Sequence, residues 1–293
     1  RTLTGLIVNL ACPSQVSEHA FQISADYWHE TRVELRRRLG DALFILPQNS
    51  AAGDQSPHLQ LGRRAEARMW RLLGRTQREE IGARIADAVT GILPSLAAEI
   101  DWSPALAHRV ETVPLSRRPL TAADVAAADA EAAAARAEYA RLRAELAAHP
   151  ELKDAPRWYV PVTGAYRRMR WNAAVAERAA RQHEPTLPVE IHVVRLGEVA
   201  FATNPFEYYL DFGLQITARS AATQTFLVQH VGRGTYVPTQ RAIAGQSYGA
   251  MPASTLVGPD GGRELVEWSV AAIQAMWPVR VRLASQVAST FTL

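Results

Sequence analysis

The stretch that decides the fold is EIHVVRLGEVAFATNPFE, residues 190–207. It holds two runs rich in branched and apolar residues, 190–196 and 198–203, separated by the tight turn Leu196-Gly197-Glu198. We expect a pair of strands here, followed directly by the polar segment from Asn204 to Glu207. Apolar runs of the same kind predict further strands at 4–10, 42–47 and 225–231.

Helical signals alternate with these strands. One helix is expected to begin at an N-cap on Ser24 and to stop at Gly40, and another to begin at the capping box formed by Thr76 and Glu79. A third, ending before Pro278, is indicated by apolar residues at helical spacing: Val266, Val270, Ile273 and Trp277. Strands interleaved with helices predict an α/β fold, a layered mixed sheet flanked by helices.

An alanine-rich stretch interrupts this pattern. Residues 121–148 begin with a cap at Thr121 and are mostly alanine, the best helix former, so a long helix is expected there. A second helix is predicted at about 165–183. We therefore divide the chain into an α/β domain, 1–114 and 186–293, and a helical hairpin insertion, 115–185. The insertion is interpreted as a solvent-facing excursion, a homo-oligomer contact or a dedicated partner-binding arm.

Composition excludes several classes of protein. The chain has 293 residues, 48% of them apolar, which suffices for a packed core. Its net charge is +3, its only lysine is Lys153 and its longest basic block is Arg36-Arg37-Arg38, so no nucleic-acid partner is expected. The single cysteine, Cys12, allows no intrachain disulfide. No apolar run approaches the roughly 18 residues of a membrane span. No signal peptide lies in this chain, and its entry at Arg1 straight into a strand suggests that a preceding segment is missing or was cleaved.

Polar segments follow four of the expected strands: 12–15, 48–56, 204–207 and 232–236. In open α/β sheets ligands bind outside the carboxyl ends of the strands, so parallel strands would bring together Cys12, Ser56, Glu207 and Tyr236. Each residue also has a structural interpretation. Cys12 is by default a small buried apolar residue, the Gly53–Pro57 loop a turn, and Glu207 a carboxylate in the first turn of a helix.

Several short motifs, taken in order, resemble the neutral ceramidase family. They are Leu10-Ala11-Cys12-Pro13-Ser14, Ile23-Ser24-Ala25-Asp26, the Gly53-Asp54-Gln55-Ser56-Pro57 loop, Asn204-Pro205-Phe206-Glu207 and Tyr236-Val237-Pro238-Thr239. Family members have A-V-H-x-T-S, I-S-x-D, G-D-x-S-P, P-G-E and Y-V-T-T in this order. A further family tyrosine, twelve residues beyond the metal tyrosine, corresponds to Tyr248. The resemblance covers about 1–60 and 186–277.

The resemblance implies a zinc amidohydrolase that cleaves the amide of N-acylsphingosine. Glu207 would be the carboxylate ligand of Zn²⁺ and Tyr236 the phenolic ligand. Ser56 would be the nucleophile or the group that orients the attacking water, and Tyr248 would donate to the oxyanion. The implied partner is a small-molecule or lipid amide substrate, which is compatible with peripheral contact with a membrane. Because relatives are commonly exported, a secreted or periplasmic location is expected.

The chain differs from the family at the positions that bind the metal. Cys12 stands at the second metal histidine, where a thiolate could replace the imidazole, and the first metal histidine belongs to a segment ahead of Arg1. Phe206 replaces the glycine of P-G-E. Of the eight histidines, His29 and His58 lie nearest the expected site and could supply a ligand.

Three hypotheses follow from this comparison. The first is a metal-dependent amide hydrolase. The second is a ceramidase-like protein without catalysis that binds lipid or a partner. The third is a metal-free serine hydrolase that uses Ser56 with His58 or His29.

Overall fold

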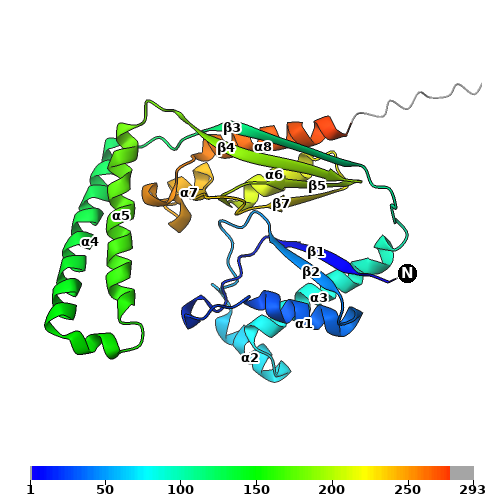
Figure 1. Cartoon of the computed structure of the whole chain (residues 1–293), viewed down its shortest axis with the longest axis horizontal. Coiled ribbons are helices and arrows are strands. Elements are labelled where there is room, and N and C mark those ends of the chain that lie inside the picture. Colours follow the sequence, from blue (N-terminus) through cyan, green and yellow to red (C-terminus); the bar gives the residue numbers. More distant parts are fainter. Residues whose placement is uncertain (1, 278–293) are drawn as a thin grey trace, which may run out of the picture.

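A four-stranded mixed sheet forms the centre of the computed structural model, which describes residues 2–277 (Figure 1). The spatial order is β3 (Leu106–Ser116), β4 (Thr186–Leu196), β5 (Val199–Thr203) and β7 (Gln224–Val228). β4 runs antiparallel to both β3 and β5, whereas β5 and β7 are parallel. The turn between β4 and β5 contains Gly197 at φ 58°, a conformation that glycine adopts readily. The predicted α/β class and the strands of residues 190–203 are thus confirmed.

Two helices pack on this sheet and close its core. They are α6 (Leu210–Arg219) and α8 (Pro259–Met276). α8 buries Leu265, Val266, Val270 and Ile273 against sheet residues such as Ile191. The predicted apolar stripe is therefore confirmed over three of its four positions, since Trp277 lies one residue beyond the helix as its C-cap.

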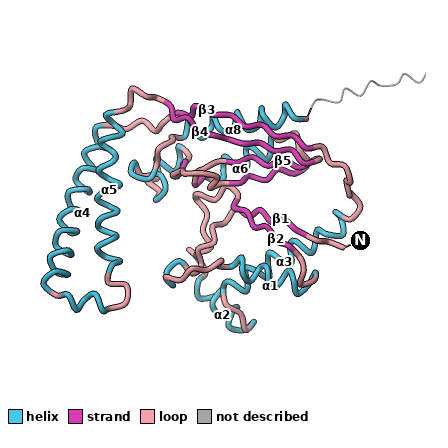
Figure 2. Tube along the Cα trace, viewed as in Figure 1, coloured by secondary structure: helices cyan, strands magenta, loops and turns pink. Residues whose placement is uncertain are grey.

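The N-terminal part forms a smaller layer beside the sheet (Figure 2). Parallel strands β1 (Gly5–Leu10) and β2 (Phe44–Asn49) pack against α1 (Tyr27–Leu39) and α3 (Gln77–Leu96), and α2 (Arg63–Leu73) precedes α3. The cap of α1 differs from the prediction. Asp26 is the N-cap and its carboxylate accepts from Tyr27 N–H, while Ser24 Oγ accepts from Asp26 N–H. The capping box of Thr76 and Glu79 is present, as predicted.

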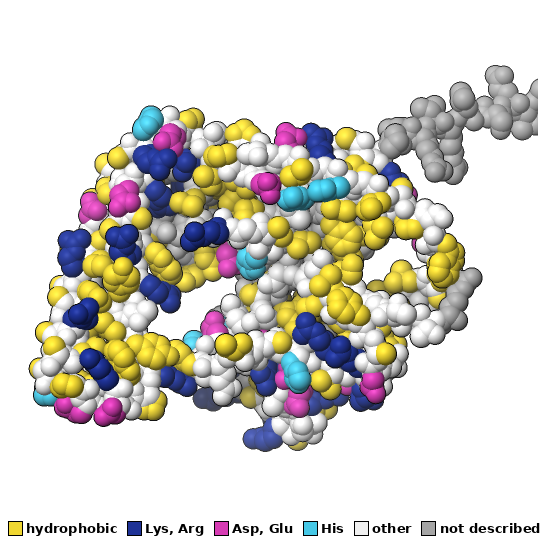
Figure 3. All heavy atoms as spheres, viewed as in Figure 1, with side chains coloured by type: hydrophobic (Ala, Val, Ile, Leu, Met, Phe, Trp, Pro, Cys, Tyr) yellow, Lys and Arg dark blue, Asp and Glu magenta, His cyan; other side chains and the backbone are white. Residues whose placement is uncertain are grey.

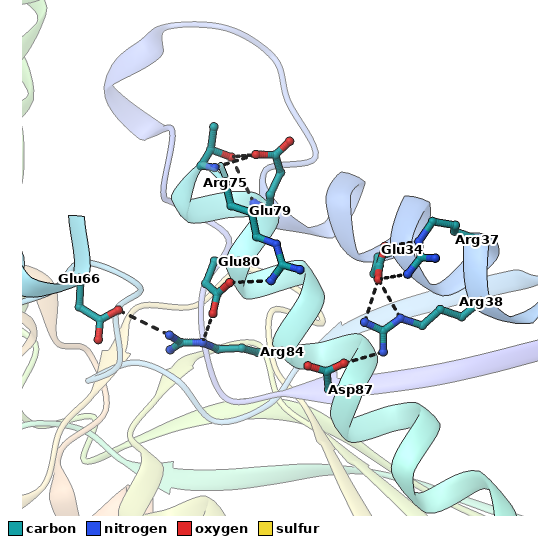
Figure 4. Close-up of polar contacts among 10 residues, drawn as sticks. Glu34, Arg37, Arg38, Glu66, Arg75, Glu79, Glu80, Arg84 and Asp87 are labelled. Atoms are coloured by element: carbon teal, nitrogen blue, oxygen red, sulfur yellow. Dashed lines mark hydrogen bonds and ion pairs between the residues drawn. The ribbon is translucent and has the colours of Figure 1, made fainter. Parts of the chain in front are cut away.

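Ion pairs join α1 to α3 on the surface of this layer (Figure 4). Arg38 lies 2.8 Å from Glu34 on its own helix and 2.6 Å from Asp87 on α3. Arg84 lies 2.8 Å from Glu80. Of these pairs only Arg38–Asp87 links the two helices, whose apolar faces cover the two-stranded sheet.

A helical hairpin projects from the body between β3 and β4 (Figure 1). It consists of α4 (Ala122–Ala148), a short 3-10 turn (Pro150–Asp154) and α5 (Tyr159–Ala180). Both helices were predicted, although α5 begins earlier than residue 165. They lie inside the 115–185 range, and the division into domains stays a prediction. Small buried residues, Ala128, Ala132 and Ala135, let the helices approach closely. No helix in the 2–277 range is both long and apolar enough to cross a bilayer.

Candidate functional site

The carboxyl ends of four strands meet at one edge. Ser50 N–H donates to Leu10 C=O after β1, Gln229 N–H to Asn49 C=O after β2, and Asn204 N–H to Val228 C=O after β7, each at 3.0 Å. The loops that follow β1, β2, β5 and β7 consequently gather beside one another (Figure 2). This confirms the expectation that these polar segments share an edge.

Two very short parallel strands, β6 (Glu207–Tyr208) and β8 (Tyr236–Val237), are paired at this edge, with Glu207 opposite Tyr236. The serine loop packs against the same place. Gly53 N–H donates to Tyr208 C=O at 2.8 Å, and a Cβ on Gly53 would lie 2.2 Å from the Glu207 carbonyl oxygen. The side-chain oxygen Oε1 of the buried Gln229 accepts from the backbone N–H groups of Ala52 and Tyr208. Backbone contacts therefore hold the loop and both strands together.

A cavity of about 720 Å³ opens at this junction. Three of the predicted site residues line it, namely Ser56, Tyr236 and Tyr248. They come from the loop after β2, from β8 and from the short 3-10 turn Tyr248–Ala250. Its volume lies in the range typical of small-molecule sites, about 300–1,000 Å³. The cavity is thus a candidate active site built from segments far apart in the sequence.

Ser56 is exposed and polar groups surround its oxygen. The side-chain amide of Gln15 donates to Ser56 Oγ at 3.5 Å, and the backbone N–H of His58 donates to it at 3.1 Å. The His58 ring contacts Glu18, with Nε2 3.0 Å from Oε1, and not Ser56. His29 is exposed on α1. The arrangement therefore gives no support to a pairing of Ser56 with either histidine.

The tyrosines form the opposite wall. The ring centroids of Tyr236 and Tyr248 lie 5.9 Å apart at 79°, and Tyr248 is 70% exposed. Burial, with the neighbouring Glu207 carboxylate second, raises the pKa of Tyr236 to about 12. A cavity residue that the sequence analysis missed is Tyr209, whose hydroxyl lies 3.1 Å from Ser247 Oγ and whose pKa burial also raises. The phenols of Tyr236 and Tyr209 are therefore neutral at pH 7 and can donate hydrogen bonds.

Glu207 lies in β6 and not in a helix, which corrects the structural interpretation made from the sequence. The helix begins at Leu210, and its first N–H is capped by Asp54 Oδ1 at 2.8 Å. The Glu207 side chain is about one-third exposed, and its Oε2 lies 3.3 Å from His230 Nε2. His230 was also missed. Its position directly after an apolar run, like those of the predicted residues, was the available signal.

Cys12 is half-buried and packs against the apolar cluster of the N-terminal layer, which includes Tyr27. Burial raises the pKa of its thiol, and Tyr27 Oη donates to the Cys12 carbonyl at 2.6 Å. Within residues 2–277 no three His, Cys, Asp or Glu side chains are placed to hold a metal ion. Glu207 and Tyr236 are together, but the described side chains do not by themselves form a zinc site.

The fold is that of an α/β protein with a polar cavity at the carboxyl edge of its strands, and structural comparison finds the same fold in two solved ceramidase structures. The chain is similar to neutral ceramidase from Pseudomonas aeruginosa, with a TM-score of 0.56 and 15% identity over 93% of this chain. It is also similar to a ceramidase solved in complex with C2, with a TM-score of 0.54 and 13% identity over 94% of the chain.

This chain spans 44% and 46% of the length of those two proteins. No protein-family model and no curated protein matches it. The resemblance inferred from the motifs is thus confirmed at the level of the fold.

Proposed function

We propose that this chain is a ceramidase-like hydrolase that acts on an N-acyl amide, with a serine and two tyrosines lining its active site. The observation that supports it is the 720 Å³ cavity in which Ser56, Tyr236 and Tyr248 meet beside Glu207. Hydrolysis adds water to the carbonyl carbon, breaks the C–N bond and releases the amine with a proton. A site for this reaction needs donors for the oxyanion and a group that positions or supplies the nucleophile.

The residues of this chain can perform these tasks. The hydroxyl groups of Tyr236 and Tyr248 donate hydrogen bonds toward the carbonyl oxygen, where negative charge develops. Ser56 Oγ accepts from Gln15 and from the His58 N–H, which leaves its own hydrogen free to be given up or to orient a water. The carboxylate of Glu207, beside His230, is the acceptor for a proton at this edge.

The substrate is inferred to be a lipid amide because a second cavity adjoins the first. It has a volume of about 620 Å³ and shares Tyr248 with the serine cavity. Its walls include Trp171 of α5 and the exposed Met251, together with alanines of α4. An apolar chain bound there would place its amide beside Tyr248, at the mouth of the polar cavity.

We also propose that the hydrolase depends on zinc. Glu207 and Tyr236 would be its ligands, as the motifs imply, and the half-buried Cys12, which packs against the N-terminal apolar cluster, would be the third. Since the described side chains do not complete the shell, we assign no step of the reaction to the metal. A ceramidase-like protein that binds the amide without hydrolysing it is the second candidate, favoured by the half-buried position of Cys12.

One experiment separates the two. The purified chain, with and without added zinc, is mixed with a fluorogenic long-chain N-acyl amide, and both turnover and equilibrium binding are measured. We expect Ser56→Ala and Glu207→Gln to lower turnover by about 10²-fold or more, the usual loss for a site donor. Ser103→Ala, in an exposed loop, is the matched control and should retain activity. Saturable binding with no release of amine would overturn the hydrolase and establish the binding protein.

A further inference from the structure

The distal half of the hairpin contains a cavity separate from the candidate active site. It has a volume of about 470 Å³, lies between α4 and α5 near the 3-10 turn, and shares no lining residue with the serine cavity. The cavity is large enough for a small molecule. Tyr139, Arg143 and Leu146 line it from α4, a helix that is otherwise mostly alanine.

Two cations stand at this cavity without acidic partners. The Arg143 guanidinium lies 5.8 Å from the Tyr139 ring and donates to its hydroxyl at 3.1 Å. Lys153 Nζ, from the only lysine of the chain, lies 5.9 Å from the Trp158 ring. Neither makes an ion pair with any residue in the described part of the chain. Arg141 differs, since it lies 2.9 Å from Glu138 and 3.0 Å from Glu145.

The remaining walls are aromatic and aliphatic. Tyr139 and Tyr166 face each other with centroids 5.5 Å apart, and Leu146 and Val162 complete the apolar lining. None of the lining residues is acidic. Figure 3 shows the result on the surface, where basic and hydrophobic side chains lie side by side along the hairpin. Cations beside aromatic faces are common, but here the cations also border an open cavity.

We propose that this hairpin cavity binds a small amphipathic anion, a carboxylate or phosphate head on an apolar body. The head pairs with Arg143 and Lys153, which supply charge-assisted hydrogen bonds and have no carboxylate partner among the described residues. The apolar body lies against Tyr139, Tyr166 and the aliphatic residues between them. A free fatty acid and the head of an anionic phospholipid share this chemistry.

The test uses dodecanoate, below its micellar concentration, titrated into the full chain by calorimetry. We expect one saturable site, with dodecanol and dodecyltrimethylammonium bound at least about tenfold more weakly. Arg143→Gln combined with Lys153→Gln should weaken dodecanoate binding by about tenfold or more. Arg141→Gln, on the same helix but already ion-paired, is the matched control and should bind as the parent does.

A second set of measurements distinguishes a free fatty acid from a phospholipid head and tests the apolar wall independently of the two cations. Sedimentation with vesicles of phosphatidylglycerol or of phosphatidylcholine shows whether a phospholipid head competes with dodecanoate. Tyr166→Ala keeps both cations but removes an apolar wall, so it should also weaken dodecanoate binding.

Dodecanoate and anionic vesicles bound equally by the double variant and the parent would overturn the proposal, as would equal binding of dodecanol. Ser56→Ala should bind dodecanoate normally, which separates this site from the hydrolase.

Discussion

Replacing Gly53 with alanine tests whether the serine loop and the Glu207 strand form one rigid unit. A Cβ at this position would lie 2.2 Å from the Glu207 carbonyl oxygen and 2.6 Å from its carbon. These are backbone atoms, which cannot rotate away as a side chain could. Loop and strand would have to separate by roughly 1 Å to restore an ordinary contact. The 2.8 Å hydrogen bond from Gly53 N–H to Tyr208 C=O would then be stretched or lost.

We expect Gly53→Ala to lower the free energy of unfolding by about 2–3 kcal/mol, the upper part of the range for overpacking. In a chain of this size that corresponds to a fall in Tm of about 5–10 °C. Turnover of an N-acyl amide should fall with it, because Ser56 and Glu207 would no longer keep their spacing. Thermal unfolding followed by circular dichroism measures the first effect, and the fluorogenic amide measures the second.

Gly91→Ala is the matched control for this substitution. Gly91 lies inside α3, and a Cβ added there would have no neighbouring atom within 4 Å, so alanine should stabilise the helix by about 0.5–1 kcal/mol. An unchanged Tm for Gly53→Ala, or a rise like that of Gly91→Ala, would refute this reasoning. Such a result would mean that the loop does not approach the Glu207 backbone as closely as the structure shows.

Three further predictions concern single side chains. The pKa of Tyr236 is about 12 in the folded chain and about 10 in the unfolded chain, so folding favours the neutral phenol. The free energy of unfolding should therefore fall as the pH rises from about 10 to about 12. Tyr236→Phe should reduce this dependence, because Tyr209 and other buried tyrosines with raised pKa values remain, and should remove one step from an ultraviolet titration. Burial raises the pKa of the Cys12 thiol, so iodoacetamide should react at least about tenfold more slowly in the folded chain than in urea; equal rates would contradict the buried position. Arg38→Gln breaks the pair with Asp87 and should cost about 0.5–1 kcal/mol in urea denaturation, whereas Arg37→Gln, paired only within its own helix, should cost less.

The pattern of apolar residues predicted the inner strands but not β3. That strand, Leu106–Ser116, includes the charged Arg109 and Glu111 and a proline, and only Val113 and Leu115 are buried. An edge strand with one exposed face tolerates both charge and proline, so its sequence lacks a strand signal. Its existence depends on eleven residues of pairing with β4, a tertiary contact that local propensity does not encode.

The candidate site was predictable in its segments and less so in its side chains. Strand order alone brings Ser56, Glu207 and Tyr236 to one edge, because the loops follow strands that end together. The direction of each side chain depends on packing that the sequence does not show. Cys12 follows β1 as expected, yet its sulfur joins the apolar cluster of the N-terminal layer and Tyr27 binds its carbonyl. A thiol is small and apolar enough to be buried there.

Close contacts at three glycines explain how the candidate site keeps its shape. A Cβ on Gly234 would lie 2.1 Å from the Pro205 carbonyl oxygen, and one on Gly249 would lie 2.8 Å from the Tyr236 ring. Together with Gly53, these glycines allow the segments around the cavity to pack directly against one another. The shape of the cavity therefore depends on close packing that a Cβ at any of these three positions would disturb. Because one fold can carry different chemistries, this frame by itself assigns no reaction to the chain.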